Sequence, residues 1–191
     1  MDIREQIRNV EALEEALKSE LPNVMQFRAG NDMGVMVSNR VQMKGESSTG
    51  DKFSPYSTDT TYINTIDNSP KKLRPKGKTG RTVFKSTGKP HKTTYFGGGY
   101  KEFRSKIGRS TDKNFELYGE MWRKFGVKRV ETNNDKTTVV LGGTTPEAQK
   151  KIDENSKREG RSIIDANKQE ITVVEEILQN WINDLAQKAF N

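Results

Sequence analysis

Residues 170–190 read EITVVEEILQNWINDLAQKAF and decide the most secure element of the fold. Apolar side chains recur there every three or four residues, which is the spacing of one face of an α-helix. Residues 167–170, just before this stretch, have the pattern of a helix N-cap. We therefore predict a terminal helix that buries one apolar stripe in the core: Ile171, Val174, Ile177, Leu178, Trp181, Ile182, Leu185 and Ala189.

Residues 1–44 also have a helical pattern, and we predict two N-terminal helices there. The first is amphipathic and stops before Pro22, because proline interrupts helical hydrogen bonding. The second covers residues 23–43. Gly30 and Gly34 each weaken a helix by about 1 kcal/mol relative to Ala, and we interpret them as sites of close packing against the first helix. The apolar stripe of the first helix is Ile3, Ile7, Val10, Leu13, Leu17 and Leu21.

Residues 111–191 predict a small sheet followed by helices. Residues 130–141 read as a β-hairpin, because their central residues tolerate left-handed backbone. A capping threonine followed by Pro146 begins a polar helix that ends near Gly160. Shorter elements are predicted earlier in the chain: strands at 82–84 and 93–96, and helical turns around residues 100–107. The pattern is that of an α+β fold.

The middle of the chain is basic and poor in core residues. Between residues 71 and 113 there are fourteen Lys and Arg, opposed only by Glu102 and Asp112. The whole chain of 191 residues is 31% hydrophobic and has a net charge of +7. We predict a single domain over 1–191, in which helices at 1–44 and a sheet with helices at 111–191 flank an extended basic arm at 45–110. Such an arm suits phosphate, an acidic protein face or an anionic membrane.

Catalytic, cofactor and metal motifs are not recognisable in the sequence. Gly77-Lys78-Thr79 has the end of a phosphate-binding loop, but Lys72 stands where the motif needs its first Gly. The single histidine, His91, is too few for a zinc site in a chain without cysteine. No apolar run approaches the roughly 20 residues that span a bilayer. We predict no enzyme activity, no cofactor or metal, no membrane segment and no small-molecule substrate.

Two sets of residues in the arm are candidates for binding. Cations can contact phosphate or an acidic partner, and aromatic side chains can anchor a segment or stack on bases. The candidates for electrostatic contact are Arg74, Lys76, Lys78, Arg81 and Lys85. The candidates for anchoring the arm are Phe53, Tyr56, Tyr95 and Phe96.

Three short segments with recognisable patterns follow one another along the chain. The first places an Arg near a helix end, before a Gly-rich turn with aromatic residues: Arg40, Val41, Gly50, Phe53, Pro55, Tyr56 and Ser57. The second spaces hydrophobic residues around a glycine: Phe115, Leu117, Gly119 and Met121. The third precedes the closing helix: Gly160, Arg161, Ser162, Ile163 and Ile164, followed by Glu170. In this order the segments resemble the virion-morphogenesis and tail-completion families of tailed bacteriophages. Ser162 and Ile163 replace the Pro and aromatic residue usual there.

The resemblance implies an α+β fold, with a small antiparallel sheet packed by the N-terminal and C-terminal helices. It also implies a homo-oligomeric ring at the head–tail connection of a virion, assembled in the host cytoplasm. Other neck, portal and tail proteins would be its partners, and the basic arm would contact genomic DNA without reading its sequence. The alternative hypothesis, from the charge of the arm, is a nucleic-acid-binding protein.

Overall fold

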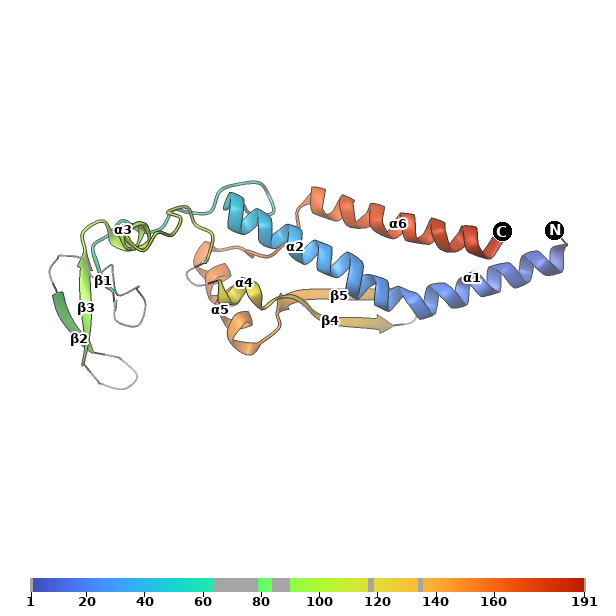
Figure 1. The fold of residues 1–191 in the computed structure, drawn as a ribbon, viewed down its shortest axis with the longest axis horizontal. Helices are drawn as coiled ribbons and strands as arrows, with labels where there is room; N and C mark the ends of the chain where they lie inside the picture. Colours follow the sequence, from blue (N-terminus) through green and yellow to red (C-terminus); the bar gives the residue numbers. More distant parts are fainter. Residues whose placement is uncertain (1, 64–78, 84–89, 117–118, 134–135, 191) are drawn as a thin grey trace. The chain divides into compact units, whose positions relative to one another are not determined.

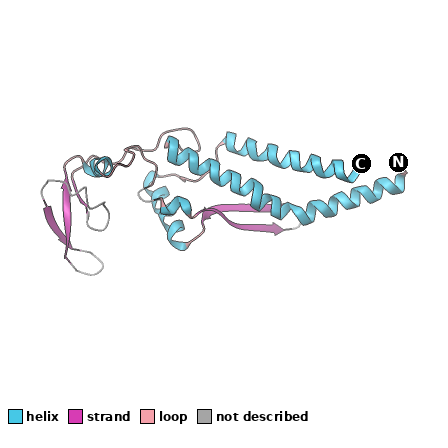
Figure 2. Ribbon diagram, viewed as in Figure 1, coloured by secondary structure: helices cyan, strands magenta, loops and turns pink. Residues whose placement is uncertain are grey.

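The computed structural model describes residues 2–63, 79–83, 90–116, 119–133 and 136–190. Helices and strands are mixed along the chain (Figure 2), which confirms the predicted α+β class. The chain forms two compact units. Unit 1 comprises Met1–Lys52 and Tyr118–Asn191, and unit 2 comprises Phe53–Leu117. Most of the predicted arm at 45–110 lies in unit 2, whereas residues 45–52 belong to unit 1.

Unit 1 begins with four helical segments that follow one another without a break. They are α1 (Ile3–Val24), η1 (Met25–Gly30), α2 (Asn31–Asn39) and η2 (Arg40–Lys44), of which η1 and η2 are π-helical. The prediction that the first helix stops before Pro22 is therefore wrong, because Pro22 lies inside α1. A proline has a helical φ and removes only one backbone hydrogen bond, and here the contacts of α1 with the last helix of the unit and with η1 favour continuation.

The remainder of unit 1 is a hairpin with three helices. Strands β4 (Phe125–Asn133) and β5 (Lys136–Gly143) pair antiparallel, as predicted, with a bulge after Val127. Helix α4 (Glu120–Arg123) precedes the hairpin, and α5 (Pro146–Glu159) and α6 (Lys168–Phe190) follow it. The long N-terminal helix lies between α6 and the hairpin (Figure 1). The N-terminal helix is thus covered by α6 on one side and by the hairpin on the other.

The predicted helix caps of unit 1 are confirmed. The Thr145 hydroxyl accepts a hydrogen bond from the amide of Ala148 at 3.3 Å, and α5 ends at Gly160, whose φ is +67°. At the start of α6, the side chain of Asn167 accepts from the amide of Glu170 at 2.8 Å, and the carboxylate of Glu170 accepts from the amide of Asn167 at 2.7 Å. Both caps are local in sequence, which is why the sequence predicts them.

Gly30 and Gly34 pack on the hairpin, so the interpretation that they pack on the first helix is wrong. A Cβ at position 30 would lie 2.6 Å from Cγ2 of Val127 and 3.0 Å from Cγ1 of Val139. At position 34 the nearest atom would be the Cα of Gly126, at 3.8 Å. The glycine at position 30 therefore allows η1 to approach the sheet.

The apolar stripe of α6 is buried only in part, which corrects the prediction of a plain core stripe. Trp181 and Leu185 are buried, whereas Ile171 is 44% exposed and Ile182 is 38% exposed. Helix α1 has no buried residue at all among those described. The fully buried apolar centre of unit 1 lies instead where α2, η2 and α5 meet the segment before α6: Val37, Val41, Ile152 and Ile163.

Unit 2 is a three-stranded antiparallel sheet with one helix. The strands are β1 (Thr61–Ile63), β2 (Thr79–Val83) and β3 (Pro90–Phe96), in the order β1-β3-β2, and α3 (Gly99–Lys106) follows β3. The two strands and the helical turns predicted here are confirmed, except that Phe84 lies outside the described residues. Strand β1 falls in a segment interpreted from the sequence as an extended loop, and it pairs with β3 through Tyr62 and Tyr95.

Candidate functional site

The predicted electrostatic contacts fall largely outside the described residues. Arg74, Lys76, Lys78 and Lys85 all do so. Arg81 lies on β2, in register with Lys92 on β3, but its side chain is not among those described. The role assigned to these five cations thus stays a prediction.

Three of the four predicted anchoring residues belong to an aromatic cluster within unit 2. Phe53 packs edge-on against Phe115, with ring centroids 4.8 Å apart. In the same way Tyr56 packs against Tyr100, at 5.3 Å. Phe96, only 1% exposed, packs against Phe103 at 5.4 Å, and this ring in turn meets Tyr100 at 5.6 Å.

The fourth anchoring residue, Tyr95, lies apart from this cluster. Neighbouring residues of a strand point to opposite faces of the sheet, so Tyr95 and Phe96 diverge. Tyr95 meets Tyr62 of β1, with ring centroids 5.3 Å apart, and Tyr62 is 50% exposed. Unit 2 therefore has one aromatic face in its core and an aromatic pair at its surface.

A buried arginine at the centre of unit 2 is a residue that the sequence analysis missed. Arg104 is 1% exposed, and its guanidinium lies 4.4 Å from the centre of the Tyr56 ring. It donates to the carbonyl of Ser110 at 2.6 Å, to the side chain of Asn114 at 3.1 Å, and to the carbonyl of Glu116. Arg104 thus holds the loop after α3. No local signal distinguishes it from the exposed cations around it.

Burial also changes the chemistry of Tyr56. Its hydroxyl donates to the side chain of Asn114 at 3.3 Å. Desolvation raises the pKa of Tyr56, and the positive charge of Arg104 opposes that rise only in part. The hydroxyl is therefore a neutral structural group at physiological pH, and it does not act as a base.

A second buried arginine joins two of the segments that carry the family resemblance. Arg40 donates to the carboxylate of Glu170, from Nε to Oε1 at 2.8 Å, and the two side chains are 6% and 7% exposed. The same guanidinium donates to the carbonyls of Glu46 at 2.7 Å and Asp165 at 2.6 Å. Arg40 therefore ties the end of the N-terminal helix to the start of α6.

Arg161 extends this connection at the surface of unit 1. It donates to the carbonyl of Lys52 at 3.1 Å and lies 3.7 Å from the carboxylate of Asp51. The turn that holds both acceptors is closed by a bridge between Glu46 and Lys52. Arg40 and Arg161, from the first and third of the family-like segments, thus have a structural role in unit 1. The spacing of the sequence alone does not reveal this role.

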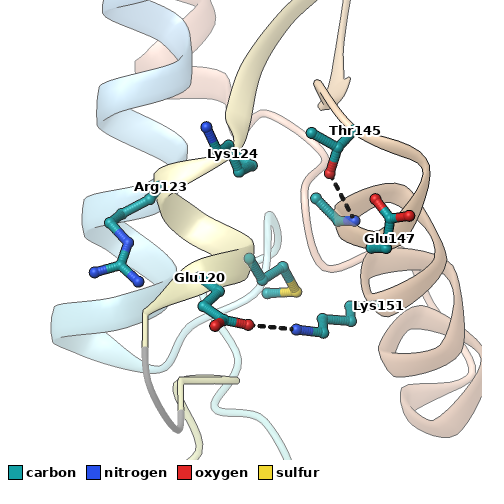
Figure 3. A pocket seen from close by; sticks show the side chains of 8 residues that line it. Glu120, Arg123, Lys124, Thr145, Glu147 and Lys151 are labelled. Atoms are coloured by element: carbon teal, nitrogen blue, oxygen red, sulfur yellow. Dashed lines mark hydrogen bonds and ion pairs between the residues drawn. The ribbon is translucent and has the colours of Figure 1, made fainter.

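One pocket of unit 1 lies between α4 and the start of α5 (Figure 3). It has a volume of about 310 Å³. Its main polar contact is an ion pair between Lys151 and Glu120 at 3.0 Å, and both side chains are at least half exposed. Among the other labelled side chains, Arg123, Lys124 and Glu147 are charged, and the Thr145 hydroxyl caps α5. The pocket offers no recognisable catalytic arrangement.

Two further observations on the described part of the chain concern metal binding and membrane crossing. No group of three or more His, Cys, Asp or Glu side chains gathers there in a way that could hold a metal ion. None of the described helices combines the length and the apolar character needed to cross a bilayer.

Exposed apolar side chains on α1 and α6 are the remaining feature of unit 1, and we refer to them together as the α1–α6 face. On α1, Ile3 is 72% exposed, and Ile7 and Val10 are each 53% exposed. On α6, Ile171 and Phe190 are 44% and 41% exposed. Apolar side chains at helical spacing that stay in water are typical of an interaction surface.

Comparison with family models, with curated proteins and with solved structures found no match to this chain. Two features of the chain bear on its function. They are the α1–α6 face and a unit 2 with a basic sequence.

Proposed function

We propose that the chain is a structural subunit of a tailed-phage virion, a neck or tail-completion protein that forms a ring at the head–tail connection. The observation that carries this proposal is the exposed apolar face of α1 and α6. The start of α1 leaves Ile3, Ile7 and Val10 more than half exposed, so this part of the apolar stripe is better accounted for by contact with another chain. Contacts between identical subunits close into rings when their rotation permits.

The order of the family-like segments supports the same proposal. Arg40 of the first segment pairs with Glu170, which follows the third segment, and Arg161 of the third segment binds the turn at 45–52. Contacts that hold a subunit in one shape suit a protein that acts by assembling with others through that shape. In this view the protein is not an enzyme, it needs no cofactor, and it acts in virion assembly.

Unit 2 supplies the connection to neighbours in this proposal. Its aromatic contacts give it a core of its own, and its basic residues can contact neck, portal or tail proteins or DNA phosphates. The cations proposed for these contacts are Arg74, Lys76, Lys78, Arg81 and Lys85.

The experiment that tests the proposal measures assembly. The full chain is sized by light scattering and negative-stain microscopy, alone and with purified phage heads or tails. We expect closed rings, and we expect Ile7→Asp together with Val10→Asp to abolish them. Val35→Asp on α2 is the control, because Val35 is 57% exposed and lies outside the proposed face. A wild-type chain that stays monomeric, both alone and with heads or tails, contradicts the proposal.

The alternative function is a nucleic-acid-binding protein, and the charge of unit 2 favours it. Unit 2 has fourteen Lys and Arg against five Asp and Glu, a formal charge of +9. This hypothesis expects tight binding of duplex DNA at physiological salt, with an affinity that falls steeply as salt rises. The structural proposal expects weak DNA binding instead. A DNA-binding titration at several salt concentrations separates the two.

A further inference from the structure

The two units differ in charge as well as in fold. Unit 2 has a formal charge of +9, whereas unit 1 has nineteen Lys and Arg against twenty-one Asp and Glu, a charge of −2. Opposite charges on separate compact units of one chain attract between copies, and they steer the encounter of those copies. The question is which surface of unit 1 would receive unit 2.

The acidic charge of unit 1 is concentrated on the exposed helix pair. Helices α1 and α6 together have nine Asp and Glu against five Lys and Arg. Glu11 and Glu15 are exposed and follow Ile7 at steps of four residues, so they border the apolar stripe of α1. Glu175 stands four residues after the exposed Ile171 on α6. The apolar face is thus bordered by carboxylates.

The surface of unit 2 has the complementary character. Lys101 is exposed. Lys106 and Arg109 are 45% and 43% exposed, and each also lies beside a carboxylate of the same unit, Glu102 and Glu116 respectively. Tyr62 is 50% exposed and contacts Tyr95 with the two rings tilted, and it adds apolar area to the surface of the same unit. Aromatic and arginine side chains are enriched in protein interfaces.

We propose that unit 2 of one copy docks on the α1–α6 face of the next copy, through its cations and the Tyr62 side chain. This inference rests on the proposed ring function and identifies the two surfaces that build the ring. Because the two surfaces differ, the contact is head-to-tail, and each copy has one of each surface to offer.

Pairing of α1–α6 with the same face of a second copy is the competing arrangement. It would bring carboxylates of the two copies together, since Glu11, Glu15 and Glu175 border the face in both. Like charges placed opposite one another at an interface disfavour it. The charge of the helix pair therefore selects the basic unit 2 as the occupant.

Charge reversal tests the docking. One variant of the full chain carries Glu11→Lys and Glu15→Lys, which spares Glu14 and its ion pair with Lys18. The other carries Lys101→Glu and Arg109→Glu. We expect each variant alone to assemble at least about tenfold more weakly than wild type at low salt, because like charges then meet. The control, Glu147→Lys with Glu154→Lys on α5, makes the same change in net charge and should assemble as wild type does.

An equimolar mixture of the two variants is the decisive measurement. Each reversed surface then meets an opposite charge on the other variant, so assembly should recover, and native mass spectrometry should find the two variants in equal numbers. If the mixture stays monomeric while a single chain with all four substitutions assembles, unit 2 docks within its own chain and the inference is wrong. If wild type forms rings and both charge-reversed variants assemble equally well, the docking is wrong but the ring function stands. Absence of wild-type assembly overturns the ring function itself.

Discussion

Breaking the buried ion pair between Arg40 and Glu170 is expected to destabilise unit 1 more than a single change to any other ion pair described here. The carboxylate of Glu170 pairs with Arg40 at 2.8 Å, and both side chains are more than nine-tenths buried. In Glu170→Gln, the amide oxygen still accepts from the Asn167 amide, so the helix cap survives. The NH2 group of the new amide then faces Nε of Arg40, so a donor meets a donor. What is lost is the hydrogen bond from Nε and the counter-charge of a guanidinium that stays buried.

The size of the effect follows from the environment of the pair. Breaking a buried ion pair by removing one partner costs about 3–5 kcal/mol, because the remaining charge stays uncompensated. For Glu170→Gln we expect the lower end, about 3 kcal/mol, since Arg40 keeps its bonds to the carbonyls of Glu46 and Asp165. For Arg40→Met we expect about 3–5 kcal/mol, because those two carbonyls also lose their donor.

The assay is urea unfolding followed by tryptophan fluorescence. Both tryptophans, Trp122 and Trp181, are buried in unit 1, so the signal reports this unit alone. The double variant, Arg40→Met with Glu170→Gln, should cost less than the sum of the single variants, because the two groups act as a pair.

The matched control is Lys18→Ala, which breaks the ion pair between Lys18 and Glu14 on α1. Those side chains are 64% and 61% exposed, so the loss should be below about 0.5 kcal/mol. If Glu170→Gln and Arg40→Met cost no more than this control, the buried pair does not stabilise unit 1 and the reasoning is refuted.

Three further predictions concern local features. The raised pKa of Tyr56 means that this side chain ionises first in the unfolded chain. The free energy of unfolding of unit 2 should therefore not depend on Tyr56 between neutral pH and about pH 10 and should fall above it, as urea unfolding followed by tyrosine absorbance would measure. Tyr56→Phe should remove that fall and cost about 0.5–1.5 kcal/mol at neutral pH. Gly30→Ala should destabilise unit 1 by about 1–3 kcal/mol in urea unfolding, because its Cβ would meet Val127 at 2.6 Å. Thr145→Ala should cost about 1 kcal/mol in the same assay, since the amide of Ala148 loses its acceptor.

Each of these predictions has an outcome that contradicts it. If the free energy of unfolding of unit 2 still falls at high pH in Tyr56→Phe, a group other than Tyr56 causes the fall. Gly34→Ala is the partner of Gly30→Ala, because a Cβ at 34 has room and should stabilise the helix by up to about 1 kcal/mol; equal effects at the two positions would contradict the packing argument. Thr145→Ser keeps the acceptor, so a loss as large as that of Thr145→Ala would show that the cap is not the cause.

The elements predicted correctly are those whose cause is local. Helix α6 and its cap depend on residues within a few positions of one another, as do the start of α5 at Thr145 and the hairpin of β4 and β5. Strand β1 was missed because it has only three residues, and it is a strand only through its pairing with β3 some thirty residues further on. The helix through Pro22 was missed because tertiary contacts offset the lost hydrogen bond.

The buried arginines show why a site is harder to predict than an element. Arg104 stands in a run of cations, and its burial depends on carbonyls that the loop after α3 brings to it. Arg40 and Glu170 are 130 positions apart, and only the resemblance to a family placed both in one pattern. Periodicity predicted the stripes of α1 and α6 correctly as helical faces, but it cannot say whether the partner of a face is the same chain or another.

The two π-helical segments in the N-terminal helix set the rotational phase of everything after them. A widened turn holds about one residue more than an α-helical turn, and one residue corresponds to a rotation of about 100°. The offset introduced at η1 lets α1 face α6 while the glycines that follow face the hairpin. Loss of a single residue between positions 25 and 30 would leave the helix intact and turn Gly34, Val37 and Arg40 away from their neighbours. We therefore expect the length of the helix at η1 to be fixed over evolution.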